Sequence, residues 1–222
     1  MRSKIFYENL CKEYNINNYT INDDMSISVD GSVNLSYRNL KSIPIKFKEV
    51  GGYFYCYGNQ LTSLKYCPET VGGDFYCDNN QLTSLRGCPR TVGGYFSCSN
   101  NQLTSLEYCP ETVSGYFNCH YNQLTSLKYC PETVGGGFNC YRNQLTNFDG
   151  LPEFFEQSIY LEGNPVYEIY RLFNQDPRCI YWIREYDVIM DMTVVEYRLE
   201  EVFHTLGISI PKDIKLKEYI LV

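Results

Sequence analysis

Eleven cysteines and two histidines are the residues of this chain that could support covalent or metal chemistry. Nine of the cysteines recur every 21 residues in two series: Cys56, Cys77, Cys98, Cys119 and Cys140, and Cys67, Cys88, Cys109 and Cys130. One cysteine per series per period is typical of a small buried apolar side chain. Equivalent side chains in neighbouring units run parallel, so they neither face one another for a disulfide nor converge in fours on a metal ion. We expect free thiols, no metal site and no cofactor.

The C-terminal part of the chain offers one candidate nucleophile, Cys179, and one candidate base, His204. Cys179 is followed by Ile-Tyr-Trp in a predicted helix, a context that is typical of a core residue. The other histidine, His120, falls within the repeats, so histidines are too few for a catalytic triad or a zinc site of their own. The sequence therefore predicts a protein without catalytic residues.

The cysteine series belong to a 21-residue unit that is repeated five times from Gly51 to Phe155 without an insertion. The third copy reads GGYFSCSNNQLTSLEYCPETV. A degenerate copy, Asp30 to Val50, precedes these five and has Arg38 at the position of Asn59. A short fixed period predicts a solenoid, in which each unit buries its apolar side against the next.

Each unit separates into inward and structural positions, which the third copy illustrates. Phe96 and Cys98 are two residues apart, so they lie on the same face of a short strand, which we expect to point inward. Asn101 follows, and its amide is expected to bond backbone groups where the chain bends. Pro110 keeps the return segment extended rather than helical, and Gly93-Gly94 is predicted to form a tight turn before the strand.

The outward strand positions vary between units, whereas the inward positions do not. Seven strands about 4.8 Å apart would form a face on the order of 30 Å long. This face is rich in tyrosine, serine, asparagine and aspartate, a composition typical of recognition surfaces. The predicted binding residues are Tyr53, Tyr55, Tyr57, Asp74, Tyr76, Asp78, Tyr95, Tyr116, Asn118, His120, Tyr141 and Arg142.

Three interpretations of this face remain open. A protein partner would use the tyrosines as anchors, with Asp74 and Asp78 selecting a cation. A glycan would stack on the same rings and bond to Asp78, Asn118 and Asn139. In the third interpretation the face is inert, and tyrosine merely suits a solvated strand. The cysteines indicate a reducing compartment inside a cell. They therefore favour a protein partner over a glycan, because glycan adhesion usually takes place outside the cell.

Segments outside the repeats are predicted to cap the open ends of the solenoid, since an uncovered strand edge invites aggregation. Residues 3–14 predict an amphipathic helix that is N-capped by Ser3, and residues 19–29 predict a hairpin. The expected packing side of the helix is formed by Ile5, Phe6 and Leu10.

At the other end, residues 156–166 predict one further strand in register with the repeats. A helix through Phe173 follows, a second begins at Asp176-Pro177, and a third spans Met192 to Leu206. Residues 208–222 fit either a strand or a short helix. The predicted division is an N-terminal cap, a solenoid and a C-terminal helical cap, at 1–29, 30–166 and 167–222.

The residue order of one unit, Phe75, Cys77, Asn80, Leu82 and Leu85, resembles the leucine-rich repeat in the short form found in secreted bacterial effectors. Gly72 departs from that pattern, as does one extra residue before the strand. The segment NNQLTSLRGCP is more closely similar to repeat proteins of large bacteriophages and giant viruses. This resemblance covers about Asp30 to Val166.

The resemblance implies a leucine-rich-repeat-like β-solenoid with short parallel strands that binds a protein, which for a viral chain is a host or viral protein. It identifies no partner. Some effector-type members carry a ubiquitin-ligase domain with a catalytic cysteine behind the repeats. An enzyme whose activity lies in the C-terminal region is therefore the remaining alternative.

Charge and composition limit the kinds of partner and the cellular compartments that are expected. Affinity for nucleic acids comes largely from Lys and Arg, and the net charge of −7 argues against a nucleic-acid partner. The N-terminal residues carry scattered charges in place of the apolar run of a signal peptide, and no segment has the length of a membrane span. Together with the cysteines, these features predict a reduced, cytoplasmic protein that does not enter a membrane.

Overall fold

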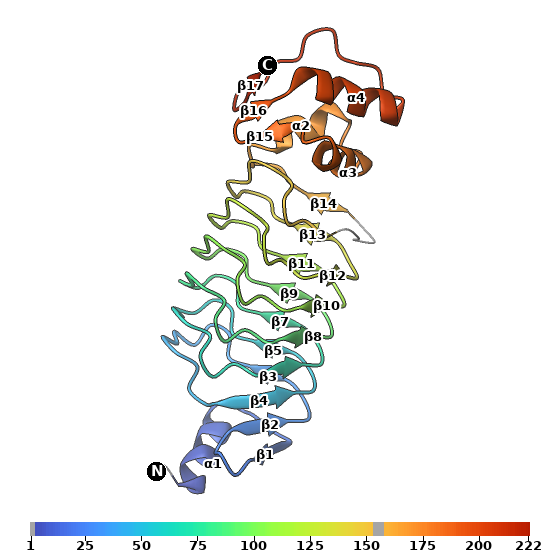
Figure 1. The fold of residues 1–222 in the computed structure, drawn as a ribbon. Helices are drawn as coiled ribbons and strands as arrows, with labels where there is room; N and C mark the ends of the chain where they lie inside the picture. The colour runs from blue at the N-terminus through green and yellow to red at the C-terminus, as the bar shows by residue number, and fades with distance from the viewer. Residues whose placement is uncertain (1–2, 153–157) are drawn as a thin grey trace.

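The computed structural model describes residues 3–152 and 158–222, so Phe155, the last residue of the fifth repeat, lies outside them. The chain winds into a single elongated stack of coils with one terminus at each end (Figure 1). One helix covers the N-terminal end, and helices with a small sheet cover the C-terminal end. The fold is a parallel-stranded β-solenoid, as the repeat period predicted.

One strand of each coil joins the Phe sheet, so named because a phenylalanine begins most of its strands. Its neighbouring strands are parallel and in register, so that Phe54 lies opposite Phe75 and Tyr55 opposite Tyr76. Its seven described strands are β3 (Val33–Asn34), β5 (Phe54–Tyr55), β7 (Phe75–Tyr76), β9 (Phe96–Ser97), β11 (Phe117–Asn118), β13 (Phe138–Asn139) and β14 (Ile159–Tyr160).

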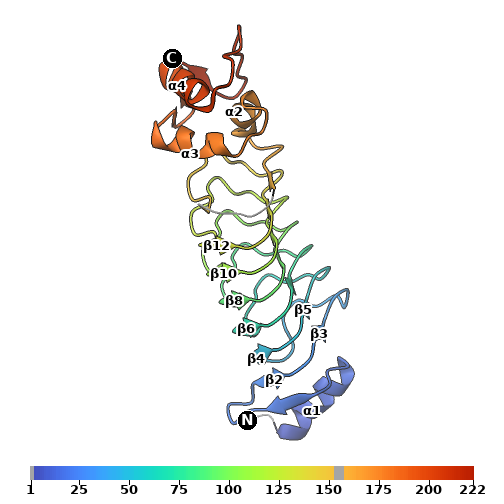
Figure 2. The same cartoon turned by 90° about the vertical axis from the view of Figure 1, so that its right-hand side faces the viewer.

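A second sheet, here the Val sheet, runs along another side of the coils (Figure 2). It forms because proline keeps the return segment extended and the following valine points inward, whereas the threonine beside it is exposed. The sequence did not predict this sheet. Its described strands are β1 (Tyr19–Ile21), β2 (Ile27–Val29), β4 (Phe47–Val50), β6 (Thr70–Val71), β8 (Thr91–Val92), β10 (Thr112–Val113) and β12 (Thr133–Val134).

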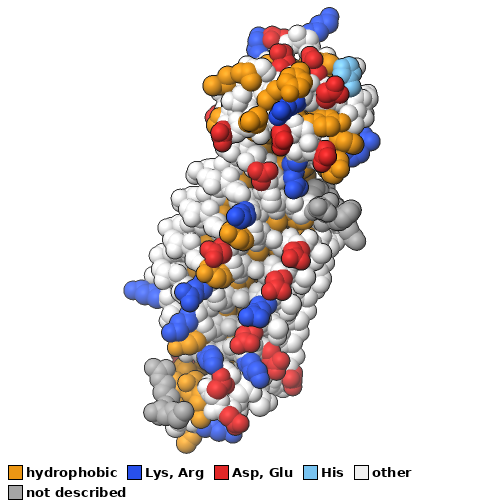
Figure 3. All heavy atoms as spheres, in the orientation of Figure 1, with side chains coloured by type: hydrophobic (Ala, Val, Ile, Leu, Met, Phe, Trp, Pro, Cys, Tyr) orange, Lys and Arg blue, Asp and Glu red, His pale blue; other side chains and the backbone are white. Residues whose placement is uncertain are grey.

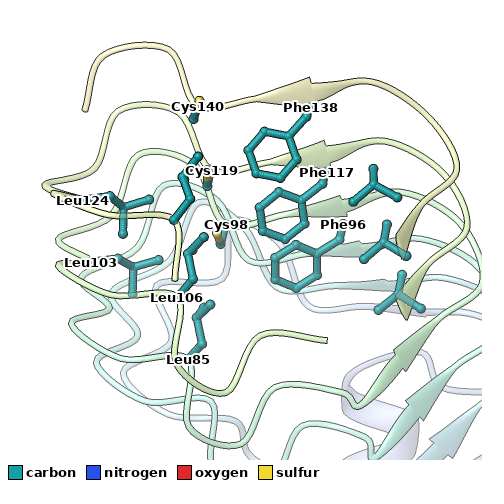
Figure 4. Close-up of a cluster of buried hydrophobic side chains, with 14 of the residues drawn as sticks. Leu85, Phe96, Cys98, Leu103, Leu106, Phe117, Cys119, Leu124, Phe138 and Cys140 are labelled. Carbon is teal, nitrogen blue, oxygen red and sulfur yellow. The ribbon is translucent and has the colours of Figure 1, made fainter. Parts of the chain in front are cut away.

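The interior of the coils is a set of side-chain columns (Figure 4). The phenylalanine rings stack on one another, with centroids 5.8 Å apart between Phe75 and Phe96 and 5.0 Å apart between Phe117 and Phe138. The cysteines of the first series and the leucines of the same coils lie beside them and are fully buried, as Cys98 and Leu103 illustrate. In the second series, Cys88, Cys109 and Cys130 are half-buried. The inward direction of the Phe, Cys and Leu positions is therefore confirmed.

A ladder of buried asparagines holds each coil to the one before it. The Asn101 amide donates to the carbonyl oxygens of Cys77 and Cys98, each 3.1 Å away, and its oxygen accepts the N–H of Leu82 at 3.0 Å. Cys77 and Leu82 belong to the preceding coil. The structural role predicted for asparagine is confirmed, and the same bonding pattern is made by Asn80, Asn122, Asn143 and Asn164.

The paired glycines lie at the corner where the Val sheet meets the Phe sheet. A Cβ atom on Gly72 would lie 2.2 Å from the carbonyl oxygen of Gly51, so the close approach of neighbouring coils is what favours glycine here. Ser114 stands in the same series, and its N–H bond to Val92 lengthens to 3.2 Å, compared with 2.9 Å from Gly72 to Val50. Coil contact, and not only the predicted turn, therefore explains these glycines.

The N-terminal cap consists of α1 (Lys4–Glu13) and the hairpin of β1 and β2. The hairpin is confirmed, and β2 continues the Val sheet by pairing in parallel with β4. The predicted packing side of the helix is only partly right, because Leu10 packs against the core but Ile5 is 66% exposed, whereas Cys11 is fully buried. Tyr7 and Tyr14 pack against the core beside Cys11, so the buried stripe is rotated relative to the prediction.

The C-terminal cap contains α2 (Tyr167–Leu172), α3 (Arg178–Glu185) and α4 (Glu196–Leu206), with Gly207 ending α4 in a left-handed conformation. The helix predicted from Met192 is shorter than expected, because its first residues form a strand. That strand belongs to a small sheet of β15 (Ile189–Met190), β16 (Thr193–Val194) and β17 (Ile220–Leu221). The Tyr219 hydroxyl donates to the carbonyl of Thr146 at 2.6 Å, which ties the end of the chain to the last coils.

Asn101→Ala should lower the free energy of unfolding by about 3 kcal/mol, because one buried N–H and three backbone carbonyl groups lose a partner. Urea denaturation followed by circular dichroism measures the effect. The matched control is Gln102→Ala, which removes an exposed neighbouring side chain and should change the stability by less than about 0.5 kcal/mol. Equal effects of the two substitutions would show that the ladder contributes no special stability.

Candidate binding face

The twelve residues predicted to bind a partner flank or belong to the strands of the Phe sheet, on the side away from the buried phenylalanines. Most of their side chains are partly buried against one another, whereas Arg142 is exposed, as are Tyr53 and Tyr95, at 38% and 54%. We call this surface the outer face of the Phe sheet. It divides into an aromatic cluster, a notch and a second aromatic cluster.

The first cluster is a stack of tyrosine rings across the first two regular strands, β5 and β7. Tyr53 and Tyr55 stack with centroids 4.1 Å apart, and Tyr55 and Tyr76 stack at 4.7 Å with an interplanar angle of 9°. Tyr57 lies against Tyr55 at 5.9 Å and meets the ring of Tyr37 edge-on at 5.1 Å. The strand register therefore orders these rings before any ligand arrives.

The carboxylate of Asp74 holds this cluster in place through two hydrogen bonds. One of its carboxylate oxygens accepts the backbone N–H of Tyr95 at 2.7 Å, and the other accepts the Tyr55 hydroxyl at 3.4 Å. Burial, followed by the nearby charge of Asp74, raises the pKa of Tyr76 to about 12. The Tyr76 hydroxyl therefore stays protonated at neutral pH and can donate a hydrogen bond.

A notch of about 390 Å³ interrupts the aromatic surface after Tyr76. It arises because the next coil carries Ser97 and Ser99 at the positions where the first regular coil carries Tyr55 and Tyr57. The two serines are 6% and 3% exposed and form its floor. Its sides are lined by Tyr76, Asp78, Asn79, Tyr95, Asn100, Tyr116, Asn118 and His120.

The side chain of Asp78 reaches the neighbouring coil, whose Ser97 and Ser99 form the floor of the notch. Its Oδ1 atom accepts the hydroxyls of Ser97 and Ser99, together with the Ser99 backbone N–H at 3.0 Å. No residue in the described part of the chain donates a hydrogen bond to Oδ2 of Asp78. The notch therefore presents one carboxylate oxygen that is available to a ligand.

The opposite side of the notch holds a neutral imidazole. The Nδ1 atom of His120 lies 2.6 Å from the side-chain oxygen of Asn118, and its Nε2 atom lies 3.4 Å from the amide nitrogen of Asn100. This pattern places the proton on Nδ1, because Nε2 faces a donor. Burial lowers the pKa of His120 below its ordinary value, an effect that the charge of Asp78 partly opposes.

The second aromatic cluster lies beyond the notch. The guanidinium carbon of Arg142 lies 5.1 Å from the ring centroid of Tyr121 and 5.3 Å from that of Tyr141. These two rings meet edge-on at 5.5 Å. The predicted residues are thus brought together in two groups, with Tyr141 and Arg142 separated from the first cluster by the notch.

Sequence reasoning did not assign Ser97, Ser99, Asn100 and Tyr121 to the site. Tyr121 is a left-handed residue in the turn after the strand, with a φ angle of 52°, where a strand pattern gives no direction for the side chain. The signal for the notch was present in the sequence as two small residues that interrupt two tyrosine-bearing series in the same coil. A change from large to small side chains marks a hollow on an otherwise regular sheet.

A larger open groove of about 610 Å³ follows the corner of glycines and the edge of the Val sheet. Its lining repeats almost the same groups in successive coils, including Thr70, Thr91 and Thr112. A ligand would meet no distinctive arrangement of groups along it, so we place the candidate site on the outer face of the Phe sheet, which includes the notch.

All eleven cysteines are free thiols, and the described residues include no group of three or more His, Cys, Asp or Glu side chains placed to hold a metal ion. Within residues 3–152 and 158–222, no helix has the length and apolar character needed to cross a membrane. Cys179 is fully buried, and burial raises its pKa far above the ordinary value for a thiol.

The burial of His120 predicts how its contribution to stability depends on pH. Because the folded state holds its pKa below the ordinary value of 6.5, the unfolded chain takes up the proton first as the pH falls through 6.5. The contribution of His120 to stability is thus retained above pH 6.5 and is lost as the pH falls toward the folded pKa. An NMR titration should place the His120 midpoint below 6.5, with His120→Asn used to assign the resonance; a midpoint above 6.5 contradicts the neutral imidazole.

No protein-family model and no curated protein matches the sequence. Among solved structures, the chain is similar to a Shigella effector LRR domain, at 25% identity and a TM-score of 0.47, over 60% of this chain and 58% of that chain. It is also similar to YopM from Yersinia enterocolitica, at 17% identity and a TM-score of 0.32, over 73% of this chain and 51% of that chain. The 21-residue coils themselves, with parallel strands, inward leucines and a buried asparagine ladder, make the fold a leucine-rich-repeat-like β-solenoid.

Proposed function

We propose that this chain is a non-catalytic module that binds a protein through the outer face of the Phe sheet. The observation that carries the proposal is the stack of tyrosine rings, already ordered by the strand register, beside a polar notch. Tyrosine anchors on a rigid support give a large contact area at a small cost in side-chain entropy. Binding residues that are ordered in the free protein lose little further freedom on association.

The distribution of charge supports a protein over a nucleic acid. Acidic and basic side chains are interspersed along the side of the coils that Figure 3 shows, and they form no continuous basic stripe there. The net charge is −7. A partner that tracks phosphates would need a row of Lys and Arg, whereas a protein partner can pair with mixed charges at the rim of an interface.

The cysteines support a reducing compartment, and we propose a cytoplasmic location, in the host cytoplasm for a chain of viral origin. Thiols occupy the core positions of successive coils, where burial raises the pKa of Cys98 and Cys119 well above the ordinary value. In this setting the partner is an intracellular protein, of the host or of the virus.

Replacing Tyr55 and Tyr57 together should abolish binding of the partner while the fold is retained. Tyr55→Asn and Tyr57→Ser introduce residues that the chain already carries in the same series, at Asn118 and Ser99, so the coils tolerate them. The partner is first isolated from the native host by affinity purification and mass spectrometry and is then prepared in pure form. Calorimetry should show an affinity reduced by at least about tenfold, because buried tyrosines dominate interface energies.

A matched control removes a tyrosine from another part of each coil. Tyr108 is 52% exposed and has a φ angle of 71°, and Gly87 occupies the same series in the preceding coil. Tyr108→Gly should leave the affinity unchanged. An affinity that survives the double substitution on the outer face, or that falls equally in the control, contradicts the proposed face.

Cys179 offers a separate test against catalysis in the C-terminal region. Because the thiol is buried and its pKa is raised, iodoacetamide should not label Cys179 in the native protein, although it labels the residue after denaturation. Mass spectrometry of tryptic peptides measures both states. Rapid labelling in the native state would reveal a reactive thiol and would favour the enzyme alternative.

A further inference from the structure

We propose that the notch receives an arginine side chain of the protein partner, with its guanidinium plane stacked on Tyr76 and its N–H groups bonded to Asp78. The inference rests on the proposed function, because it names the group that the partner inserts into the outer face. It adds a chemical requirement that the tyrosine cluster alone does not impose, namely a positive charge on a planar group.

The stack of tyrosine rings is interrupted by a vacancy, a strand position that carries no ring. Tyr53, Tyr55 and Tyr76 form a continuous stack, and the residue paired with Tyr76 on the next strand is Ser97. Neighbouring strands lie about 4.8 Å apart, which is close to the 4.7 Å between the rings of Tyr55 and Tyr76. A planar group above Ser97 would therefore continue the stack by one more layer.

The notch carries a negative charge. Its lining contains the carboxylate of Asp78 and neither a lysine nor an arginine. Two serines are bonded to Oδ1 of Asp78, which fixes the carboxylate and leaves Oδ2 as an acceptor. A ligand that covered this oxygen without donating a hydrogen bond would bury an unpaired charge, which is strongly unfavourable.

The remaining sides of the notch add no compensating positive charge. His120 is neutral at pH 7 because burial lowers its pKa, and its ring is engaged by Asn118 and Asn100. Asp74 adds a second negative charge beside the tyrosine stack. Burial is the larger cause, and the charge of Asp74 the next, that raises the pKa of Tyr55 and of Tyr76. The two carboxylates and the tyrosine rings thus form an electronegative surface that is suited to a cation.

Arginine satisfies these requirements better than other side chains. Its guanidinium is planar, always charged and able to stack on an aromatic ring while its N–H groups reach a carboxylate. A lysine would pair with Asp78 but has no plane to continue the stack. An aromatic residue would stack but would leave the carboxylate unpaired.

The test uses the purified full chain and three capped tripeptides, acetyl-Gly-X-Gly-amide, in which X is arginine, citrulline or lysine. Citrulline keeps the shape and plane of arginine but is uncharged. Chemical-shift changes in the NMR spectrum of the labelled protein report affinity and location. The arginine peptide should shift the resonances of the notch residues and should bind at least about tenfold more tightly than the citrulline peptide.

Two variants and a control separate charge from shape. Asp78→Asn keeps an oxygen for Ser97 and Ser99 but removes the charge, so the arginine and citrulline peptides should bind alike. Ser97→Tyr places a ring in the vacancy, as at Tyr55 and Tyr76 in the same series, and should abolish arginine binding. Asn139→Tyr adds a ring in the same series away from the notch and should leave binding unchanged. Thermal unfolding confirms that each variant is folded.

Several outcomes overturn the inference: no binding of the arginine peptide, equal affinity for arginine and citrulline in the unsubstituted protein, or arginine binding that persists in Ser97→Tyr. Notch shifts caused by a methyl glycoside in the absence of an arginine response would instead assign the site to a sugar. None of these results decides the proposed function, because Tyr55 and Tyr57, which test it, do not line the notch. Loss of partner binding in Tyr55→Asn with Tyr57→Ser, together with a silent notch, would retain the face and reject the arginine.

Discussion

The buried asparagine ladder is the interaction on which the rest of the structure depends. Each amide bonds to carbonyl groups of its own coil and of the preceding coil, and its oxygen accepts a backbone N–H of the preceding coil. These backbone groups lie at the bend after each strand, where no strand partner is available to them. Because the same atoms must meet in every coil, an insertion of even one residue would leave several of them unpaired, and the constant period of 21 residues follows.

A constant interior leaves the outer face free to vary. The phenylalanine, cysteine and leucine columns fix the spacing of the strands, so an outward residue can change without disturbing the register. The positions of Tyr55, Tyr76 and Ser97 are equivalent in their coils, yet they produce a stack of rings followed by a notch. The inward positions therefore determine stability, and under the proposed function the outward positions would determine which partner binds.

The sequence predicted the solenoid, the inward columns and the asparagine role, because these repeat in every coil and follow from the period alone. It missed the Val sheet, since strands of two residues such as Thr91–Val92 carry no alternation that could reveal them. It also misplaced the buried stripe of α1, where Cys11 packs and Ile5 does not, because the direction of a short terminal helix depends on the coil beneath it. The notch was not predicted because the bond between Asp78 and Ser97 joins different series on neighbouring strands.

The order of the outer face in the free protein has a consequence for how it can recognise a partner. Rings that are stacked by the strand register and a carboxylate that is fixed by two serines lose little freedom on binding. The same rigidity prevents the face from adapting, since moving Tyr76 would disturb its stacking on Tyr55 and moving Asp78 would break its bonds to the floor of the notch. Under the proposed function, a partner would therefore have to bring the complementary shape and charge itself, and the face would discriminate against partners that leave Asp78 unpaired.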